Sequence, residues 1–166
     1  MNPDRHLPRS TRRLLATMRR QYRRSIRDPE SHRILRYILA TNPEALPASV
    51  FLSMRDRIRY HHEDPHVVAT LPVLYGDPCK GGGVGDCNDF AVSTAALGKI
   101  GRYQVRWALG LDAEGFPAHV WTQMRRDQGA WIDVDPTPGA PAPGGGSPVD
   151  VPGARIVGWV PIDVER

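Results

Sequence analysis

The chain has 166 residues, of which 40% are hydrophobic, 24% charged and 7% aromatic. This composition is typical of a globular protein with one domain, and it excludes a fibre, a wholly disordered chain and a small protein built on disulfides. A chain of this length can bury a sizeable core without metal or cross-links. The sequence has two cysteines, no apolar run near the ~20 residues that cross a bilayer and no secretory signal. We therefore expect a cytoplasmic protein with no membrane span and with both thiols free.

The formal net charge of +4 is unevenly distributed along the chain. Residues 1–36 carry eleven arginines and three acidic residues, or +8, which leaves 11 basic and 15 acidic residues, or −4, in the rest. We predict a basic helical extension over residues 1–45 and an enzyme domain over 46–166. The arginines could bind an acidic partner or nucleic acid. The interpretation we favour is that an apolar stripe docks on the domain and leaves the arginines in water.

The first sixty residues are predicted to be helical, because apolar residues recur at intervals of three and four. Ser10 and Thr11 are plausible N-caps for a first helix that stops at Asp28. Further apolar stripes predict helices over 29–42 and 47–60. The glycines and prolines of 65–85 predict a long irregular loop.

After this loop we expect a helix from Cys87 to Ile100, closed by Gly101 in a left-handed cap. Alternating polar and apolar residues then predict strands, and a proline- and glycine-rich loop is expected near the C-terminus. The predicted strands are 102–110, 118–125, 130–135 and a possible fourth at 155–162, and the loop is 136–154. The predicted fold is therefore α+β, with N-terminal helices and the cysteine helix packed on an antiparallel sheet.

Three reactive residue types fall on the elements that a thiol enzyme needs. Cys87 begins a helix, His119 lies on a strand, and an aspartate follows on the hairpin partner of that strand. A thiolate is the attacking species, and the first turn of a helix stabilises it and offers N–H groups to an oxyanion. The neighbouring carboxylate of Asp86 opposes the thiolate, so an imidazolium is needed as well.

The length of the hairpin loop decides which side chains share a face. If the loop is Asp127-Gln128-Gly129, with Gly129 supplying a positive φ, the numbers of paired residues sum to 256. His119 then lies diagonal to Asp135 on one face. Asp133 has the same parity, and geometry alone does not choose between the two aspartates.

Three motifs, in their order along the chain, resemble one family, and this resemblance implies a role for each of the three reactive residues. The segments Gly85–Ala91 (GDCNDFA), His119–Trp121 (HVW) and 131–137 (WIDVDPT) resemble the transglutaminase-like superfamily of papain-like thiol enzymes, and most closely its small bacterial and prophage members. The resemblance covers about residues 50–137. It implies that Cys87 is the nucleophile, that His119 is the base, and that Asp135, directly before Pro-Thr, orients the imidazole.

The resemblance implies an amide-directed reaction through a thioester, with no cofactor and no metal. Hydrolysis of a peptide or protein substrate is preferred, because water is always present while cross-linking by transamidation needs an amine site. The competing class is a non-catalytic binding or assembly module.

Four further residues are candidates for supporting or regulatory roles. Tyr75 could be the second oxyanion donor, Asp89 a carboxylate on the helix surface or one that braces the loop, and Trp121 an apolar cover for the site. Cys79 is interpreted as a bystander in the loop, although a reversible disulfide with Cys87 would switch the enzyme off. A zinc site that uses these cysteines and nearby histidines, including His66, is disfavoured because the spacing matches no standard ligand pattern.

Overall fold

The computed structural model describes residues 6–62, 67–77, 80–114 and 116–145 and the backbone of the strand at 155–161. It contains helices and strands in one mixed arrangement, which confirms the predicted α+β class. The helices are α1 (Arg9–Arg27), α2 (Pro29–Thr41), α3 (Leu46–Arg57), α4 (Leu71–Tyr75) and α5 (Cys87–Ile100). The strands are β1 (Arg59–Tyr60), β2 (Val84–Gly85), β3 (Gln104–Leu111), β4 (Pro117–Arg125), β5 (Ile132–Val134) and β6 (Arg155–Pro161). None of the described helices combines the length and apolar character that a membrane crossing requires.

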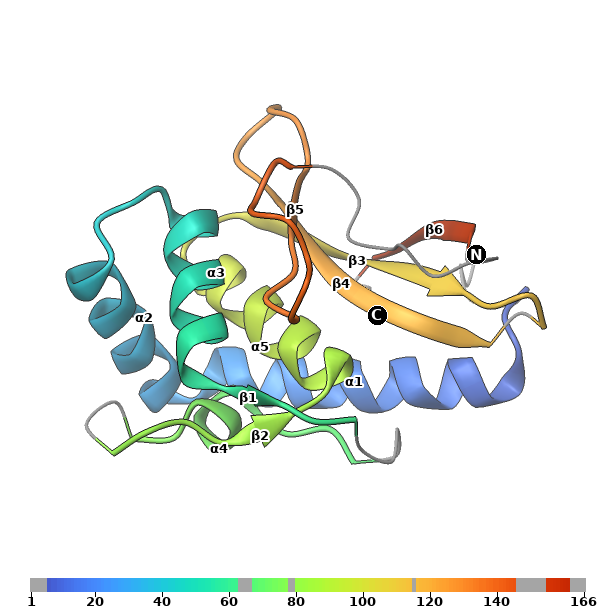
Figure 1. Cartoon of the computed structure of the whole chain (residues 1–166), viewed down its shortest axis with the longest axis horizontal. Coiled ribbons are helices and arrows are strands. Elements are labelled where there is room, and N and C mark those ends of the chain that lie inside the picture. The colour runs from blue at the N-terminus through green and yellow to red at the C-terminus, as the bar shows by residue number, and fades with distance from the viewer. Residues whose placement is uncertain (1–5, 63–66, 78–79, 115, 146–154, 162–166) are drawn as a thin grey trace.

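The main sheet has four antiparallel strands in the order β5-β4-β3-β6. Figure 1 shows α1 and α5 running beneath this sheet, with α2 and α3 at one end. The short strands β1 and β2 form a separate parallel pair, which lies next to the start of α5. The helix that begins with Cys87 therefore lies between the sheet and the other helices.

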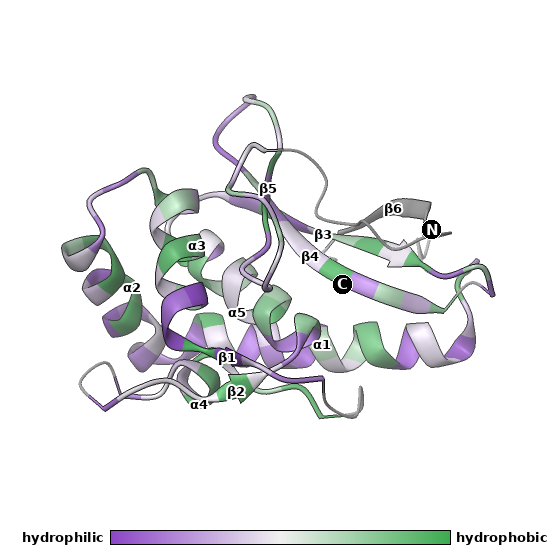
Figure 2. Ribbon diagram, in the orientation of Figure 1, coloured by the Kyte–Doolittle hydropathy of each residue, from purple (hydrophilic) through white to green (hydrophobic). Residues whose placement is uncertain are grey.

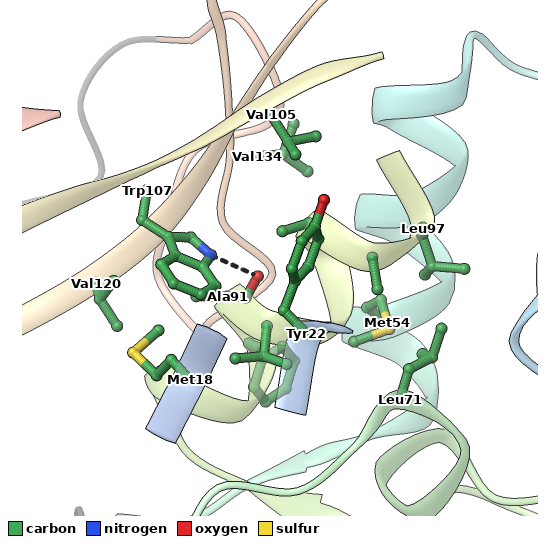
Figure 3. Close-up of a cluster of buried hydrophobic side chains, with 14 of the residues drawn as sticks. Met18, Tyr22, Met54, Leu71, Ala91, Leu97, Val105, Trp107, Val120 and Val134 are labelled. Carbon is green, nitrogen blue, oxygen red and sulfur yellow. Dashed lines mark hydrogen bonds between the residues drawn. The ribbon is translucent and has the colours of Figure 1, made fainter. Parts of the chain in front are cut away.

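Helix α5 is the centre of the core, since it contacts α1, α2, α3, α4 and the strands β3 and β4. Every residue from 88 to 98 is buried, and many of them are small, as expected for a helix enclosed on all sides. The carbonyl oxygen of Ala91 accepts hydrogen bonds from Trp107 Nε1 at 3.1 Å (Figure 3) and from Thr122 Oγ1 at 2.8 Å. These two bonds tie the first half of α5 to β3 and β4.

The basic helix α1 docks on this core through one face. Leu15, Met18 and Tyr22 are fully buried, and the Tyr22 ring meets the Trp107 ring edge-on at 6.2 Å between centroids. Apolar and polar residues alternate along α1 in Figure 2. The arginines on its other face are exposed: Arg9, Arg12, Arg13, Arg20, Arg23, Arg24 and Arg27. An apolar stripe is therefore docked and the arginines face solvent, while the predicted boundary between residues 45 and 46 stays a prediction.

Two helix ends differ from the sequence prediction. Pro8 occupies the N-cap of α1 without a side-chain hydrogen bond, so Ser10 and Thr11 lie inside the helix rather than capping it. Helix α3 ends at Arg57 instead of continuing to Tyr60. The residues after α3 become β1, because Arg59 N donates to Gly83 O at 3.1 Å and His61 N donates to Gly85 O at 3.0 Å.

The segment 65–85, predicted as an irregular loop because of its glycines and prolines, contains the short helix α4 and the short strand β2.

The positive φ angles also fall on other residues than predicted. Arg102, with φ 66°, takes the left-handed conformation after α5, whereas Gly101 has φ −74°. In the β4–β5 hairpin Asp127 has φ 53° and Gly129 does not lie in this region. An aspartate tolerates the left-handed region because its short polar side chain bonds locally.

Candidate active site

The first turn of α5 is held by reciprocal caps. The Asp86 Oδ1 atom accepts from the backbone N–H groups of Asn88 at 2.8 Å and Asp89 at 3.3 Å. In return, Asp89 Oδ2 accepts from the backbone N–H of Asp86 at 2.9 Å, which completes a capping box. This box fixes half-buried Cys87 at the first position of the helix.

The same caps limit which backbone groups can bind an oxyanion. Sequence reasoning offered the first-turn N–H groups as a set, but the Asp86 side chain occupies those of Asn88 and Asp89. The backbone N–H of Cys87 is the first-turn donor that this cap does not take. A thioester-forming reaction at Cys87 therefore calls for a second donor from elsewhere in the fold.

The hairpin has the predicted register. Strand β4 pairs with β5 through Thr122 and Val134, Gln123 and Asp133, and Met124 and Ile132, and each pair of numbers sums to 256. One residue beyond β5, the Asp135 Oδ2 atom lies 2.6 Å from His119 Nε2. The two side chains are 3% and 13% exposed, so this contact is shielded from water.

Asp135 is fixed by bonds that leave one oxygen for the imidazole. Its Oδ1 accepts from Thr137 N at 3.1 Å and from Thr137 Oγ1 at 2.8 Å. Asp133, by contrast, accepts hydrogen bonds at Oδ1 from the side chains of Trp121 and Gln123. The structure therefore separates the two aspartates that parity alone left equivalent.

Asp135 and Cys87 both act on the imidazole of His119. The Cys87 side chain lies near enough to this ring to raise its pKa, and because Asp135 takes Nε2, Nδ1 is the nitrogen left for the sulfur. Burial lowers the pKa of His119, but the hydrogen bonds and charges of Asp135 and Cys87 outweigh burial and raise it from 6.5 to about 10. The imidazole is therefore protonated at neutral pH.

Trp121 lies two residues after this histidine on β4. Its ring is stacked on the imidazole, with 5.9 Å between centroids and 19° between planes. Trp121 is 1% exposed, and Nε1 donates to Asp133 Oδ1 at 2.6 Å. The indole therefore packs against the imidazole and is also held by a polar contact.

The structure does not bring Tyr75 to this group. Tyr75 is fully buried, its hydroxyl lies 2.6 Å from Ser53 Oγ, and the Arg57 guanidinium lies over its ring at 4.6 Å. A hydroxyl engaged in this way is sealed from a substrate carbonyl. Asp89 is buried in the first turn of α5. Its Oδ1 accepts a hydrogen bond from Ala69 N at 2.6 Å, which holds the segment before α4 against α5.

Tyr60 is the residue at the site that sequence reasoning missed. Parallel pairing of β1 with β2 places Tyr60 opposite Gly85, two residues before Cys87, and its ring lies 6.1 Å from that of Phe90. Partial burial and the negative charges of Cys87, Asp86 and Asp135 raise the pKa of Tyr60 from 10.0 to about 12. Tyr60 is 38% exposed and its phenol stays protonated, so it is a hydrogen-bond donor in the neighbourhood of Cys87, Asp86 and Asp135.

The expectations about Cys79 and His66 lie outside the described residues. This applies both to the disulfide with Cys87 and to the zinc site that would use Cys79. Within the described part of the chain, no three histidine, cysteine, aspartate or glutamate side chains are grouped so that they could hold a metal ion.

Of three comparisons with known proteins, the scan against protein families gave a match. Searches of curated proteins and of solved structures gave no significant match. A scan against protein families matched residues 34–136 to the description "Transglutaminase-like superfamily". The matched region covers more than half of the chain and includes Cys87, His119 and Asp135. The chain therefore belongs to the transglutaminase-like superfamily.

Proposed function

We propose that the protein is a thiol-dependent hydrolase that cleaves amide bonds of a peptide or protein through Cys87, His119 and Asp135. The observation that carries this proposal is the place of His119, whose Nε2 lies 2.6 Å from Asp135 Oδ2 and whose pKa is raised by both Asp135 and the nearby Cys87. Membership of a superfamily of papain-like thiol enzymes supports it. A reducing cytoplasm, which keeps the thiol free, suits this chemistry.

The contacts assign one step to each side chain. His119 Nδ1 takes the proton from the Cys87 sulfhydryl, while Asp135 holds the proton on Nε2 and stabilises the charged ring. The thiolate attacks the carbonyl carbon, and the imidazolium then gives its proton to the leaving amine as the C–N bond breaks. Water, deprotonated by the same imidazole, attacks the thioester and releases the carboxylic acid and the thiol.

The oxyanion of the tetrahedral intermediate needs two donors. The backbone N–H of Cys87 supplies one, because the Asp86 cap takes the next two N–H groups instead. The hydroxyl of Tyr60 is our candidate for the second. It stays protonated among Cys87, Asp86 and Asp135, and it is partly exposed to an incoming substrate.

One experiment tests the reaction class and separates its outcomes. A denatured protein of known sequence is incubated with the enzyme in the presence and absence of a primary amine, and mass spectrometry records the products. New termini indicate peptide-bond cleavage, deamidated glutamines indicate side-chain hydrolysis, and incorporated amine indicates transamidation. We expect hydrolysis products that disappear in Cys87→Ala and His119→Ala.

The control is Tyr75→Phe, which removes a buried hydroxyl outside the site. Products that survive in Cys87→Ala refute the proposal, and so does a folded wild-type protein that neither hydrolyses substrates nor forms a thioester. The second result favours a non-catalytic binding module.

The exposed arginines of α1 support a further contact with an acidic partner or nucleic acid. Because the apolar face of α1 is docked, the arginines present their charge to solvent. Binding of DNA that falls steeply with salt, and that is weakened when Arg20, Arg23 and Arg24 are replaced by Gln, would support nucleic acid as that partner. Binding that does not depend on these arginines argues against it.

A further inference from the structure

A second carboxylate lies beside the proposed catalytic group and takes no part in the chemistry described above. Asp133 Oδ1 accepts two short hydrogen bonds, from Trp121 Nε1 at 2.6 Å and from Gln123 Nε2 at 2.6 Å. Gln123 is in turn oriented by Arg106 Nε, which donates to its Oε1 at 2.9 Å across the β3–β4 pair. The amide nitrogen of Gln123 therefore points at Asp133.

Trp121 links this carboxylate to the histidine. Its indole is stacked on the His119 imidazole at 5.9 Å, and the ring is 1% exposed. A cation within about 6 Å of an indole face is attracted to the π electrons, and the attraction grows when water is excluded. Since His119 is protonated at neutral pH, Trp121 is a cation–π partner of the imidazolium.

The hydrogen bond to Asp133 affects this partner in two ways. An N–H that donates to a carboxylate forms a strong charge-assisted bond, which fixes the rotation of the indole against the imidazole. The same bond polarises the indole, because hydrogen-bonded groups in a low-dielectric environment reinforce one another. A more negative ring face attracts the imidazolium more strongly.

We propose that Asp133 is a positioning residue that acts through Trp121 to stabilise the imidazolium of His119, and with it the Cys87 thiolate. The proposal rests on the proposed function, since it concerns the same cysteine–histidine pair. It gives Asp133 and Asp135 different tasks. Asp135 binds the edge of the imidazole, and Asp133 controls the aromatic face that covers it.

The charged and titratable groups around the histidine must be distinguished in any test. Asp135 after β5 contacts His119 directly, Cys87 from α5 raises its pKa, and Tyr60 from β1 lies within electrostatic range of Cys87 and Asp135. Asp133 itself faces Arg106 from β3. A direct effect of the Asp133 charge on the imidazolium would persist without Trp121, whereas an effect through the indole would not.

The experiment measures the pH profile of Cys87 alkylation by iodoacetamide, with the modified peptide quantified by mass spectrometry. Asp133→Asn keeps an acceptor oxygen for Trp121 and Gln123 but removes the charge and puts an NH2 group in place of the second oxygen, and Trp121→Phe keeps a ring and removes the N–H. We expect each to move the acidic midpoint of the profile upward by about half a pH unit or more. In the double variant, Asp133→Asn should add no further shift to that of Trp121→Phe.

Asp127→Asn is the matched control, because it removes a carboxylate from the same hairpin at an exposed position that tolerates Asn. Its profile should equal that of the wild type. The proposal is overturned by a folded Asp133→Asn variant whose midpoint does not move, or by a shift that persists in full on the Trp121→Phe background. If Asp133→Asn does not fold, an unmoved midpoint in Trp121→Phe overturns it instead.

These results are separable from failure of the proposed function. A wild-type protein whose cysteine reacts only as an ordinary thiol, titrating near pH ~8.5, has no ion pair for Asp133 to support. That outcome refutes the proposed function and this inference together. A wild-type profile with an ion pair that is insensitive to Asp133 refutes the inference alone.

Discussion

Replacing Asp135 by asparagine removes one charge from the buried contact with His119 and changes little in volume. Thr137 N and Thr137 Oγ1 both donate to Asp135 Oδ1, so they will hold the oxygen of the new amide in that place. The amide nitrogen then faces His119 Nε2 as a donor. The imidazole must accept at Nε2 and carry its proton on Nδ1, which is the wrong tautomer for taking a proton from Cys87.

The size of the effect follows from the geometry. The contact is 2.6 Å long between groups that are 13% and 3% exposed, and a hydrogen bond to a charged group contributes about 1.5–3 kcal/mol. Since one pKa unit corresponds to about 1.4 kcal/mol, the pKa of His119 should fall by about 1–2 units or more. Since the wild-type pKa is about 10, the ring of the variant should still be protonated at neutral pH but should lose its proton at a lower pH than in the wild type.

The assay is an NMR titration of the His119 ring in the wild type and in Asp135→Asn, read together with the alkylation rate. The reasoning is refuted if both proteins show the same midpoint for this histidine while remaining folded. The same midpoint would mean that Asp135 does not hold the charge on the ring.

The raised pKa of His119 also predicts how stability depends on pH. The folded protein binds a proton at His119 that the unfolded chain releases near pH 6.5, so the contribution is fully present below that pH and is lost as pH rises through about 10. Urea unfolding should therefore show that the stability advantage of the wild type over Asp135→Asn shrinks between these two values. An advantage that grows with pH would contradict the assignment.

Three other substitutions separate the site from the core. Tyr60→Phe should lower kcat on an amide substrate by about 10²-fold. The rate of alkylation by iodoacetamide should not change, because that reaction forms no oxyanion. Equal kcat values in Tyr60→Phe and the wild type would show that Tyr60 is not an oxyanion donor. Tyr75→Phe should leave the alkylation of Cys87 unchanged and lower the free energy of unfolding by about 1–3 kcal/mol in chemical denaturation, because Ser53 loses its buried hydrogen-bond partner. A changed alkylation rate would be inconsistent with the position of Tyr75. Leu97→Ala should cost about 2–5 kcal/mol in the same measurement, because Leu97 is fully buried in α5, and a negligible cost would argue against the packing of that helix.

The hairpin register could be predicted from the sequence because it depends on local signals. An odd number of loop residues keeps His119 and Asp135 on one face, and alternation along the strands fixes which residues turn inward. The start of α5 at Cys87 was equally local, since Asp86 and Asp89 form its capping box. The choice between Asp133 and Asp135 was not local. It depends on how the chain turns after Val134. Thr137 donates to Asp135 there, whereas Trp121 donates to Asp133.

Tyr60 could not be found because its position depends on a contact across the chain. Apolar residues at helical spacing predict that the helix of α3 continues to Tyr60, whereas the two-residue pairing of β1 with β2 has no alternating pattern. The position of Tyr75 also depends on packing across the chain, because the short helix α4 directs its hydroxyl to Ser53.

The central claim is that Cys87 and His119 form an ion pair, and the pH dependence of Cys87 alkylation in the wild type and in His119→Ala tests it most directly. The wild type should react rapidly from well below pH ~8.5, where an ordinary thiol titrates, and His119→Ala should lose this reactivity at neutral pH. A single titration near pH ~8.5 that is identical in both proteins would contradict the account.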